Sequence, residues 1–142
     1  MCGIAGYIGK FPPNLDYLNK TSLALQHRGP DGEGFYSHQY NDNHVTLVHR
    51  RLSILDLNHR SNQPFIYDGN ILVFNGEIYN HIEIRKNLES LGHVFKTNGD
   101  TEVLIHALCQ WGQNALDKLE GMWAFAWYDE KNGSLILSRD RF

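Results

Sequence analysis

The chain has 142 residues, of which 42% are apolar, and this length suits one domain with its own core. Its 13 basic and 16 acidic residues give a net charge of -3 and are spread along the sequence, so no basic run could follow a nucleic-acid backbone. No apolar run approaches the ~20 residues of a membrane helix, and the N-terminus lacks a signal-peptide pattern. We therefore expect a soluble, cytoplasmic protein without nucleic-acid or membrane partners.

The cysteines and histidines do not indicate a metal site or a disulfide. Cys2 and Cys109 are the only cysteines, and they lie far apart in different sequence contexts. The eight histidines show no paired spacing of the kind that metal ligands have. We expect these histidines to be ordinary surface or loop residues.

The first half of the chain predicts three strands and one helix. Gly3–Gly9 is typical of a short strand, and helically spaced leucines predict a helix that starts after Asn14 and ends before Gly29. Val45–Arg51 alternates as a strand does, while Ile71–Phe74 is a continuous apolar run that favours a buried strand. Both of these strands end next to polar residues that could form a site.

The second half predicts two helices. Asn80 and Glu83 have the spacing of a capping box at the start of a helix over about 81–91. Asp100 stands where an N-cap is expected, ahead of an apolar stripe that ends near Trp111.

The C-terminal residues predict a hairpin. Residues 122–128 and 134–139 alternate as strands do, and Asn132-Gly133 between them favours a type I′ turn. Trp123, Phe125 and Trp127 share one strand face, which is more typical of a core than of a platform for bases. Strands at both ends with helices between them indicate an α+β domain.

Cys2 carries the clearest chemical signal. Removal of Met1 would place the thiol and a free α-amino group on the same residue. An α-amino group titrates near ~8 and a thiol near ~8.5, so the amine can take the thiol proton at neutral pH. The Gly- and Ala-rich residues that follow leave room for a substrate to approach. By itself a cysteine at this position is more often a tolerated surface residue.

Other residues could complete such a site, and each also has an ordinary structural explanation. Asn75-Gly76 could aim a side-chain amide and a backbone N–H at an oxyanion, but Asn-Gly also favours a hairpin turn. Arg51 could grip a carboxylate with its guanidinium fork, although an arginine at a strand end is commonly solvated. Asp100 could cap a helix and still present an oxygen to a ligand. Glu77 could also bind a ligand, and the main alternative for it is a plain surface role.

The chain as a whole resembles the class II glutamine amidotransferase domain of the N-terminal nucleophile hydrolases, in the form found in glutamine-hydrolysing asparagine synthetases. Five segments carry this resemblance from end to end: HRGPDGEG (27–34), HRRLSILDL (49–57), FNGEIYN (74–80), GDTEVL (99–104) and GMWAFAWYD (121–129). The resemblance implies two stacked antiparallel sheets flanked by helices, the αββα sandwich.

The resemblance also implies roles for particular residues. Cys2 would be the nucleophile, and Asn75 and Gly76 would hold the oxyanion. The substrate would be L-glutamine, bound by residues from three segments of the chain: Arg51, Leu52, Ser53, Ile54, Leu55, Asn75, Gly76, Glu77 and Asp100. For the HRGPDG segment it suggests only a loop near the site, and Arg50 would be a surface neighbour of Arg51.

For the whole protein, the resemblance implies that residues 1–142 are a glutamine amidotransferase type 2 domain, C-terminally truncated, with a C-terminal synthetase domain in the full-length chain. This domain would need no cofactor or metal, whereas the synthetase domain would use ATP and magnesium. Ammonia from glutamine would convert aspartate to asparagine. Two alternatives stay open, an amidotransferase acting on another carboxylate in a surface sugar or natural product, and a noncatalytic glutamine-sensing module. The oligomeric state is also open, with a homodimer as one alternative.

Overall fold

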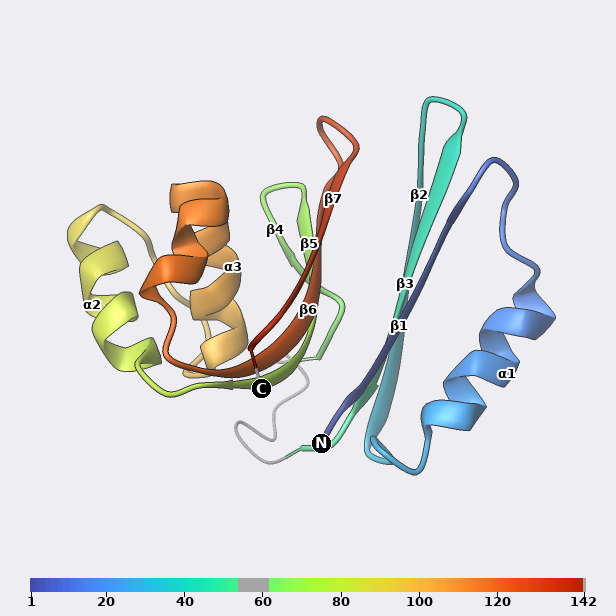
Figure 1. Cartoon of the computed structure of the whole chain (residues 1–142), viewed down its shortest axis with the longest axis horizontal. Helices are drawn as coiled ribbons and strands as arrows, with labels where there is room; N and C mark the ends of the chain where they lie inside the picture. Colours follow the sequence, from blue (N-terminus) through green and yellow to red (C-terminus); the bar gives the residue numbers. More distant parts are fainter. Residues whose placement is uncertain (54–61, 142) are drawn as a thin grey trace.

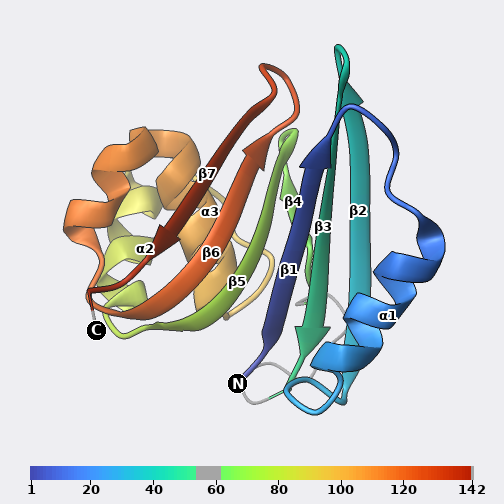
Figure 2. The same ribbon diagram turned by 45° about the vertical axis from the view of Figure 1, so that its right-hand side comes forward.

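Two antiparallel sheets are stacked face to face, with helices on both outer faces (Figure 1). The computed structural model describes residues 1–53 and 62–141. One helix covers the first sheet and two helices cover the second, so the layers follow the order helix, sheet, sheet, helix (Figure 2). The predicted α+β sandwich is confirmed.

The first sheet has the strand order β1-β3-β2. Its strands are β1 (Gly3–Gly9), β2 (Gly32–Tyr40) and β3 (Asn43–Arg51). β3 lies in the middle because it pairs with β1, where Gly3 faces Arg50, and with β2, where Gly32 faces Arg51. Helix α1 (Leu15–Leu25) packs on the outer face of this sheet.

The second sheet has the strand order β4-β5-β6-β7. Its members are β4 (Phe65–Tyr67), β5 (Asn70–Ile78), β6 (Gly121–Asp129) and β7 (Ser134–Arg139). Helices α2 (His81–Ser90) and α3 (Asp100–Trp111) cover its outer face, followed by a 3-10 turn η2 (Gly112–Lys118).

Two apolar clusters hold these layers together. The larger one joins α2 and α3 to the second sheet through residues such as Leu88, Leu104 and Phe125. The smaller one lies between the sheets and includes Leu47 and Val73. Burial of apolar surface stabilises the fold by ~25 cal/mol per Å², and this is the main force that holds the two sheets against each other.

Three local features differ from what the sequence pattern alone indicated. β5 continues through Asn75 and Gly76 to Ile78, so the alternative explanation of Asn75-Gly76 as a hairpin turn does not hold. Asp100 is the first residue of α3, and the N-cap is Gly99. The Asn80 side chain does not cap α2 but instead bridges the Lys118 carbonyl and the Glu120 N–H.

The β6–β7 hairpin also differs from the predicted type I′ turn. Four residues, Glu130 to Gly133, connect the paired positions Asp129 and Ser134. Only Gly133 of these four has a positive φ, at 72°, whereas a type I′ turn needs two such residues. The Asp129 side chain closes the loop by accepting from the Lys131 N–H and the Asn132 side chain.

Within the residues that the structure describes, none of the helices has the length and apolar character needed to cross a membrane. The N-terminus of β1 and the C-terminus of β3 lie at one end of the sandwich, next to the bend of β5 and β6 (Figure 1). Most of the sequence-predicted site residues come from this end.

Candidate functional site

A cavity of about 460 Å³ opens between the two sheets at this end of the molecule. Its walls include seven of the predicted site residues, which come from β1, β3, β5 and α3 and the residues just outside them: Cys2, Arg51, Leu52, Asn75, Gly76, Glu77 and Asp100. The fold thus brings together residues that are almost 100 positions apart in the sequence.

Cys2 precedes β1 and is partly exposed to the cavity. The Leu52 N–H donates to Cys2 Sγ over 3.4 Å, and the thiol lies 3.8 Å from the Leu52 carbonyl. Arg28 Nε donates to the Cys2 carbonyl over 3.1 Å. The backbone and the sulfur of Cys2 are therefore held from two sides, which fixes a nucleophile in one orientation.

Arg51 is the last residue of β3 and is only 8% exposed, although it lines the cavity. Its Nη1 donates to Asn62 Oδ1 over 2.7 Å, which orients the guanidinium. Leu52 follows in the cavity wall, but Ser53 does not line it and instead donates its N–H to Asp31. Ile54 and Leu55 lie outside the described residues.

Asn75 and Gly76 lie within β5, opposite Ala124 and Trp123 of β6. A Cβ on Gly76 would come within 2.2 Å of the Met122 carbonyl oxygen, so only glycine allows β6 to approach this closely. The Asn75 side chain is half-buried at the cavity wall. A half-buried amide donor on a rigid strand is suited to stabilise a developing oxyanion.

The two predicted carboxylates differ in their surroundings. Glu77 is exposed, whereas Asp100 is 7% exposed at the start of α3. Asp100 Oδ2 accepts the Ile78 N–H over 3.0 Å, which ties α3 to the end of β5. Burial raises the pKa of Asp100, and the Ile78 hydrogen bond opposes that rise. A ligand ammonium at this wall would compensate the buried charge.

The HRGPDG segment connects α1 to β2. Its hydrogen bonds hold the start of β1 and the end of β3 in place beside the cavity. Besides the Arg28 bond to Cys2, the Asp31 carboxylate accepts the Ser53 N–H over 2.7 Å and the Asp31 N–H donates to the Arg51 carbonyl. A Cβ on Gly29 would lie 2.3 Å from the Arg50 carbonyl carbon. The sequence indicated a loop here, and the structure gives its side chains a positioning role.

Two further residues beside the site were not predicted as site residues, although His49 opens the HRRLSILDL segment that carries the family resemblance. Gln63 lines the cavity, and its Oε1 accepts the Phe74 N–H over 2.6 Å. His49 lies two residues before Arg51, on the same face of β3, and its Nε2 is 3.3 Å from the Phe74 carbonyl. Burial lowers the pKa of His49 to about 4, so its ring is neutral at pH 7 and donates to that carbonyl. Both residues brace β5 beside Asn75.

Arg50 and two histidines contradict the surface roles that we expected. Arg50 is 8% exposed and reaches under α1, where it donates to the Ser22 carbonyl and lies 3.2 Å from Glu33. His49 and His106 are fully buried rather than at the surface. Among the described residues, no group of three His, Cys, Asp or Glu side chains is placed to hold a metal ion.

Comparison with known proteins places this geometry in a family. The sequence profile of the glutamine amidotransferase domain matches residues 1–142. Asparagine synthetase [glutamine-hydrolyzing] 1 of Bacillus subtilis (strain 168) is 37% identical over 100% of this chain and 23% of its own length. Asparagine synthetase [glutamine-hydrolyzing] 2 of Oryza sativa subsp. japonica is 38% identical over 99% of this chain and 23% of its length. The chain thus spans about a quarter of these relatives.

A solved structure supports the fold independently. Glutamine phosphoribosylpyrophosphate amidotransferase from B. subtilis, complexed with ADP and GMP, superposes with a TM-score of 0.68 at 24% identity over 83% of this chain and 33% of that chain. The sequence profile covers every residue, and the curated relatives exceed one-third identity over nearly the full chain. The chain therefore belongs to the glutamine amidotransferase domain family.

Proposed function

We propose that this domain hydrolyses the side-chain amide of L-glutamine to glutamate and ammonia, with Cys2 as the nucleophile. The observation that carries this proposal is the single cavity shared by Cys2, Arg51, Asn75 and Asp100. A nucleophile, a cation, an amide donor and a carboxylate around one space match the groups of an amino acid that carries a carboxamide.

Glutamine would lie across the cavity with its two ends held separately. The Arg51 guanidinium can bind the α-carboxylate through two N–H donors, and Leu52 adds the adjoining backbone wall. Asp100 and Glu77 can share the α-ammonium group. This arrangement holds the α-carbon at a fixed distance from Cys2. The glutamine side chain can span that distance, whereas the shorter asparagine side chain cannot.

The chemistry would proceed in two steps after Met1 is removed. The Cys2 thiolate attacks the amide carbon, a C–S bond forms, and Asn75 with the Gly76 N–H holds the oxyanion. The Cys2 α-ammonium donates its proton to the amide nitrogen as the C–N bond breaks, so the nitrogen leaves as ammonia. Water, deprotonated by the same amine, hydrolyses the γ-glutamyl thioester and releases glutamate and the thiol.

We further propose that the ammonia serves a synthetase region that converts aspartate to asparagine, because the relatives are described as asparagine synthetases. That region would bind ATP and magnesium, and the described residues here contribute no cluster suited to the metal. A cytoplasmic location and a homodimer fit the same proposal. A noncatalytic glutamine sensor is less favoured because the cavity keeps a nucleophile. An amidotransferase for another carboxylate would keep the same nucleophile, and it is less favoured because the relatives are described as asparagine synthetases.

Substitution of the nucleophile tests the reaction directly. In the complete gene product, Cys2→Ala is expected to abolish glutaminase activity while glutamine still binds, measured by glutamate release and calorimetry. The matched control is Cys109→Ala, since Cys109 is half-buried in α3 and burial raises its pKa to about 11. Glutaminase activity retained by Cys2→Ala would refute the proposal.

A further inference from the structure

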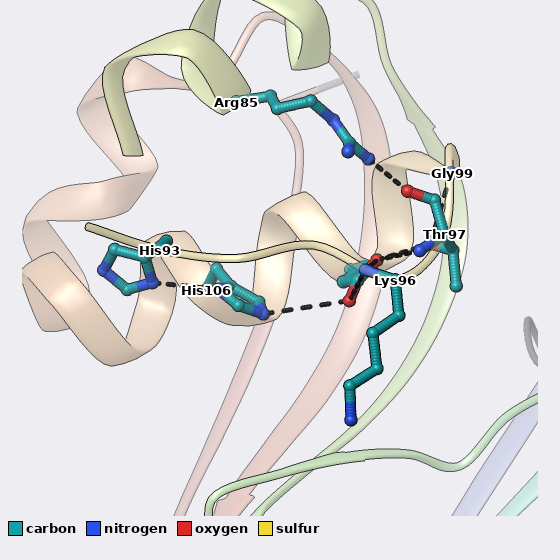
Figure 3. Close-up of polar contacts among 7 residues, drawn as sticks. Arg85, His93, Lys96, Thr97, Gly99 and His106 are labelled. Atoms are coloured by element: carbon teal, nitrogen blue, oxygen red, sulfur yellow. Dashed lines mark hydrogen bonds and ion pairs between the residues drawn. The ribbon is translucent and has the colours of Figure 1, made fainter. Parts of the chain in front are cut away.

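Glu102 is a buried carboxylate that the chemistry above does not use. It lies in the first turn of α3 and is 3% exposed. Its oxygens accept hydrogen bonds from the Lys96 N–H at 2.9 Å, the Thr97 N–H at 2.6 Å and the Thr97 hydroxyl at 2.7 Å (Figure 3). Three donors from two consecutive residues therefore converge on one side chain.

The segment held by these bonds forms part of the cavity wall. Thr97 is 4% exposed and lines the cavity together with Gly99 and Asp100. The Thr97 hydroxyl accepts the Gly99 N–H over 3.4 Å, and Arg85 Nη2 donates to the Thr97 carbonyl over 2.7 Å (Figure 3). The position of the backbone just before Asp100 thus depends on contacts that start at Glu102.

The carboxylate charge of Glu102 acts mainly on this segment. The nearest ion-pair candidate in the described part of the chain is His106, whose Nε2 lies 4.0 Å from Glu102. Tyr67 and Phe95 stack on the His106 ring, and His93 Nδ1 lies 2.8 Å from its Nδ1. Burial lowers the pKa of His106 to about 4, so this ring carries no charge at pH 7. The backbone N–H groups therefore compensate the buried carboxylate.

We propose that Glu102 is a positioning residue for the glutamine α-ammonium group, because it fixes the Lys96–Gly99 segment and through it the Asp100 carboxylate. The inference rests on the proposed glutaminase function. Cys2 and Asn75 come from the sheets and have no hydrogen bond to this segment among the described contacts. Loss of Glu102 should therefore weaken substrate binding more than it slows the chemical steps.

The Glu102→Gln variant separates charge from shape. The amide oxygen can take the place of Oε2 and still accept from Thr97, but the NH₂ donor then replaces Oε1 and faces the Lys96 N–H, and the negative charge is lost. We expect the KM for glutamine to rise about tenfold, equivalent to one charge-assisted hydrogen bond, with kcat changed less than twofold. Amide exchange in a peptide over 93–101 should accelerate, whereas exchange in β5 should not.

Two controls separate positioning from general destabilisation. Leu108→Ala removes a buried side chain of the same helix without touching the segment, and should lower Tm while leaving the KM unchanged. Should Glu102→Gln fail to fold, Thr97→Val removes the hydroxyl bond and Thr97→Ser retains it. We then expect a raised KM in Thr97→Val and a near-normal KM in Thr97→Ser.

The outcomes divide cleanly. A KM within twofold of wild type in Glu102→Gln, an equal KM rise in Leu108→Ala, or a loss confined to kcat would overturn the positioning role. A wild-type protein that neither binds nor hydrolyses glutamine would instead overturn the proposed function, and the positioning role with it. An effect on both KM and local amide exchange, absent from Leu108→Ala, supports the proposal.

Discussion

At the scale of single residues, the candidate site combines groups that differ in how much the fold constrains them. Glu77 is exposed to solvent, whereas Asp100 is buried and keeps a hydrogen bond from Ile78. When no cationic ligand is bound, a buried carboxylate lowers the stability of the protein, because desolvation disfavours its charged form. Function and stability should therefore conflict at Asp100 and not at Glu77.

Asp100→Asn tests this conflict. The asparagine oxygen can still accept the Ile78 N–H, so we expect a higher Tm at pH 7 together with weaker glutamine binding. Because burial raises the pKa of Asp100 above its usual 3.8, the folded form holds the proton more tightly and the ionisation penalty appears as the pH rises. The gain in Tm should therefore vanish as the pH falls toward 3.8.

Glu77→Gln is the matched control, since it removes a carboxylate from the same wall without relieving a buried charge. Calorimetry should show weaker glutamine binding for both variants, and only Asp100→Asn should gain Tm. A lower Tm for Asp100→Asn, or glutamine affinity equal to wild type, contradicts this assignment.

At the scale of elements, strong apolar patterns predicted the strands and helices, and polar or irregular segments were missed. β3, β6 and α3 carry regular apolar repeats, so their existence followed from the sequence. β2 was missed because its half-buried face carries Gly34, Tyr36 and His38 rather than aliphatic residues. β4 has only three residues and is too short for a periodic signal.

The sequence predicted which residues form the candidate site, but not the contacts that position them. Resemblance placed Cys2, Arg51, Asn75 and Asp100 together, and all four do line one cavity. Long-range polar contacts, such as Arg28 with the Cys2 carbonyl, join residues that no local pattern relates. Partners of this kind are set by tertiary packing, which a single sequence does not record.

Gly29→Ala tests whether the HRGPDG segment positions the site. The added Cβ would lie 2.3 and 2.4 Å from the Arg50 carbonyl carbon and oxygen, so the segment must move. We expect a loss of roughly 1–3 kcal/mol in the free energy of unfolding and a lower rate of glutamine hydrolysis. Gly32→Ala is the control, because its Cβ would meet only Arg51 Cβ at an ordinary 3.7 Å. Equal effects of the two variants would argue against the positioning role.

At the scale of the whole molecule, two buried histidines link stability to pH. Burial lowers the pKa values of His49 and His106 to about 4 from 6.5, so the unfolded chain binds protons that the folded chain does not. Stability should therefore fall as the pH drops from 6.5 toward 4, by up to ~1.4 kcal/mol per pH unit for each histidine.

Urea unfolding at pH 7 and pH 5 measures this dependence. His106→Phe keeps a ring between Tyr67 and Phe95 and should lose part of the pH dependence. His27→Gln alters an exposed histidine and should leave the pH dependence unchanged. A pH dependence equal to wild type in His106→Phe would show that His106 does not contribute.

The central claim is that the sandwich presents a methionine-free N-terminal Cys2 to glutamine in the cavity between its sheets. Intact mass after incubation of the complete gene product with a glutamine-mimicking electrophile, followed by mapping of the modified peptide, tests this claim most directly. We predict one adduct, on an N-terminal Cys2 that lacks Met1, and protection by excess glutamine. Retention of Met1, or an adduct that glutamine does not block, would contradict the account.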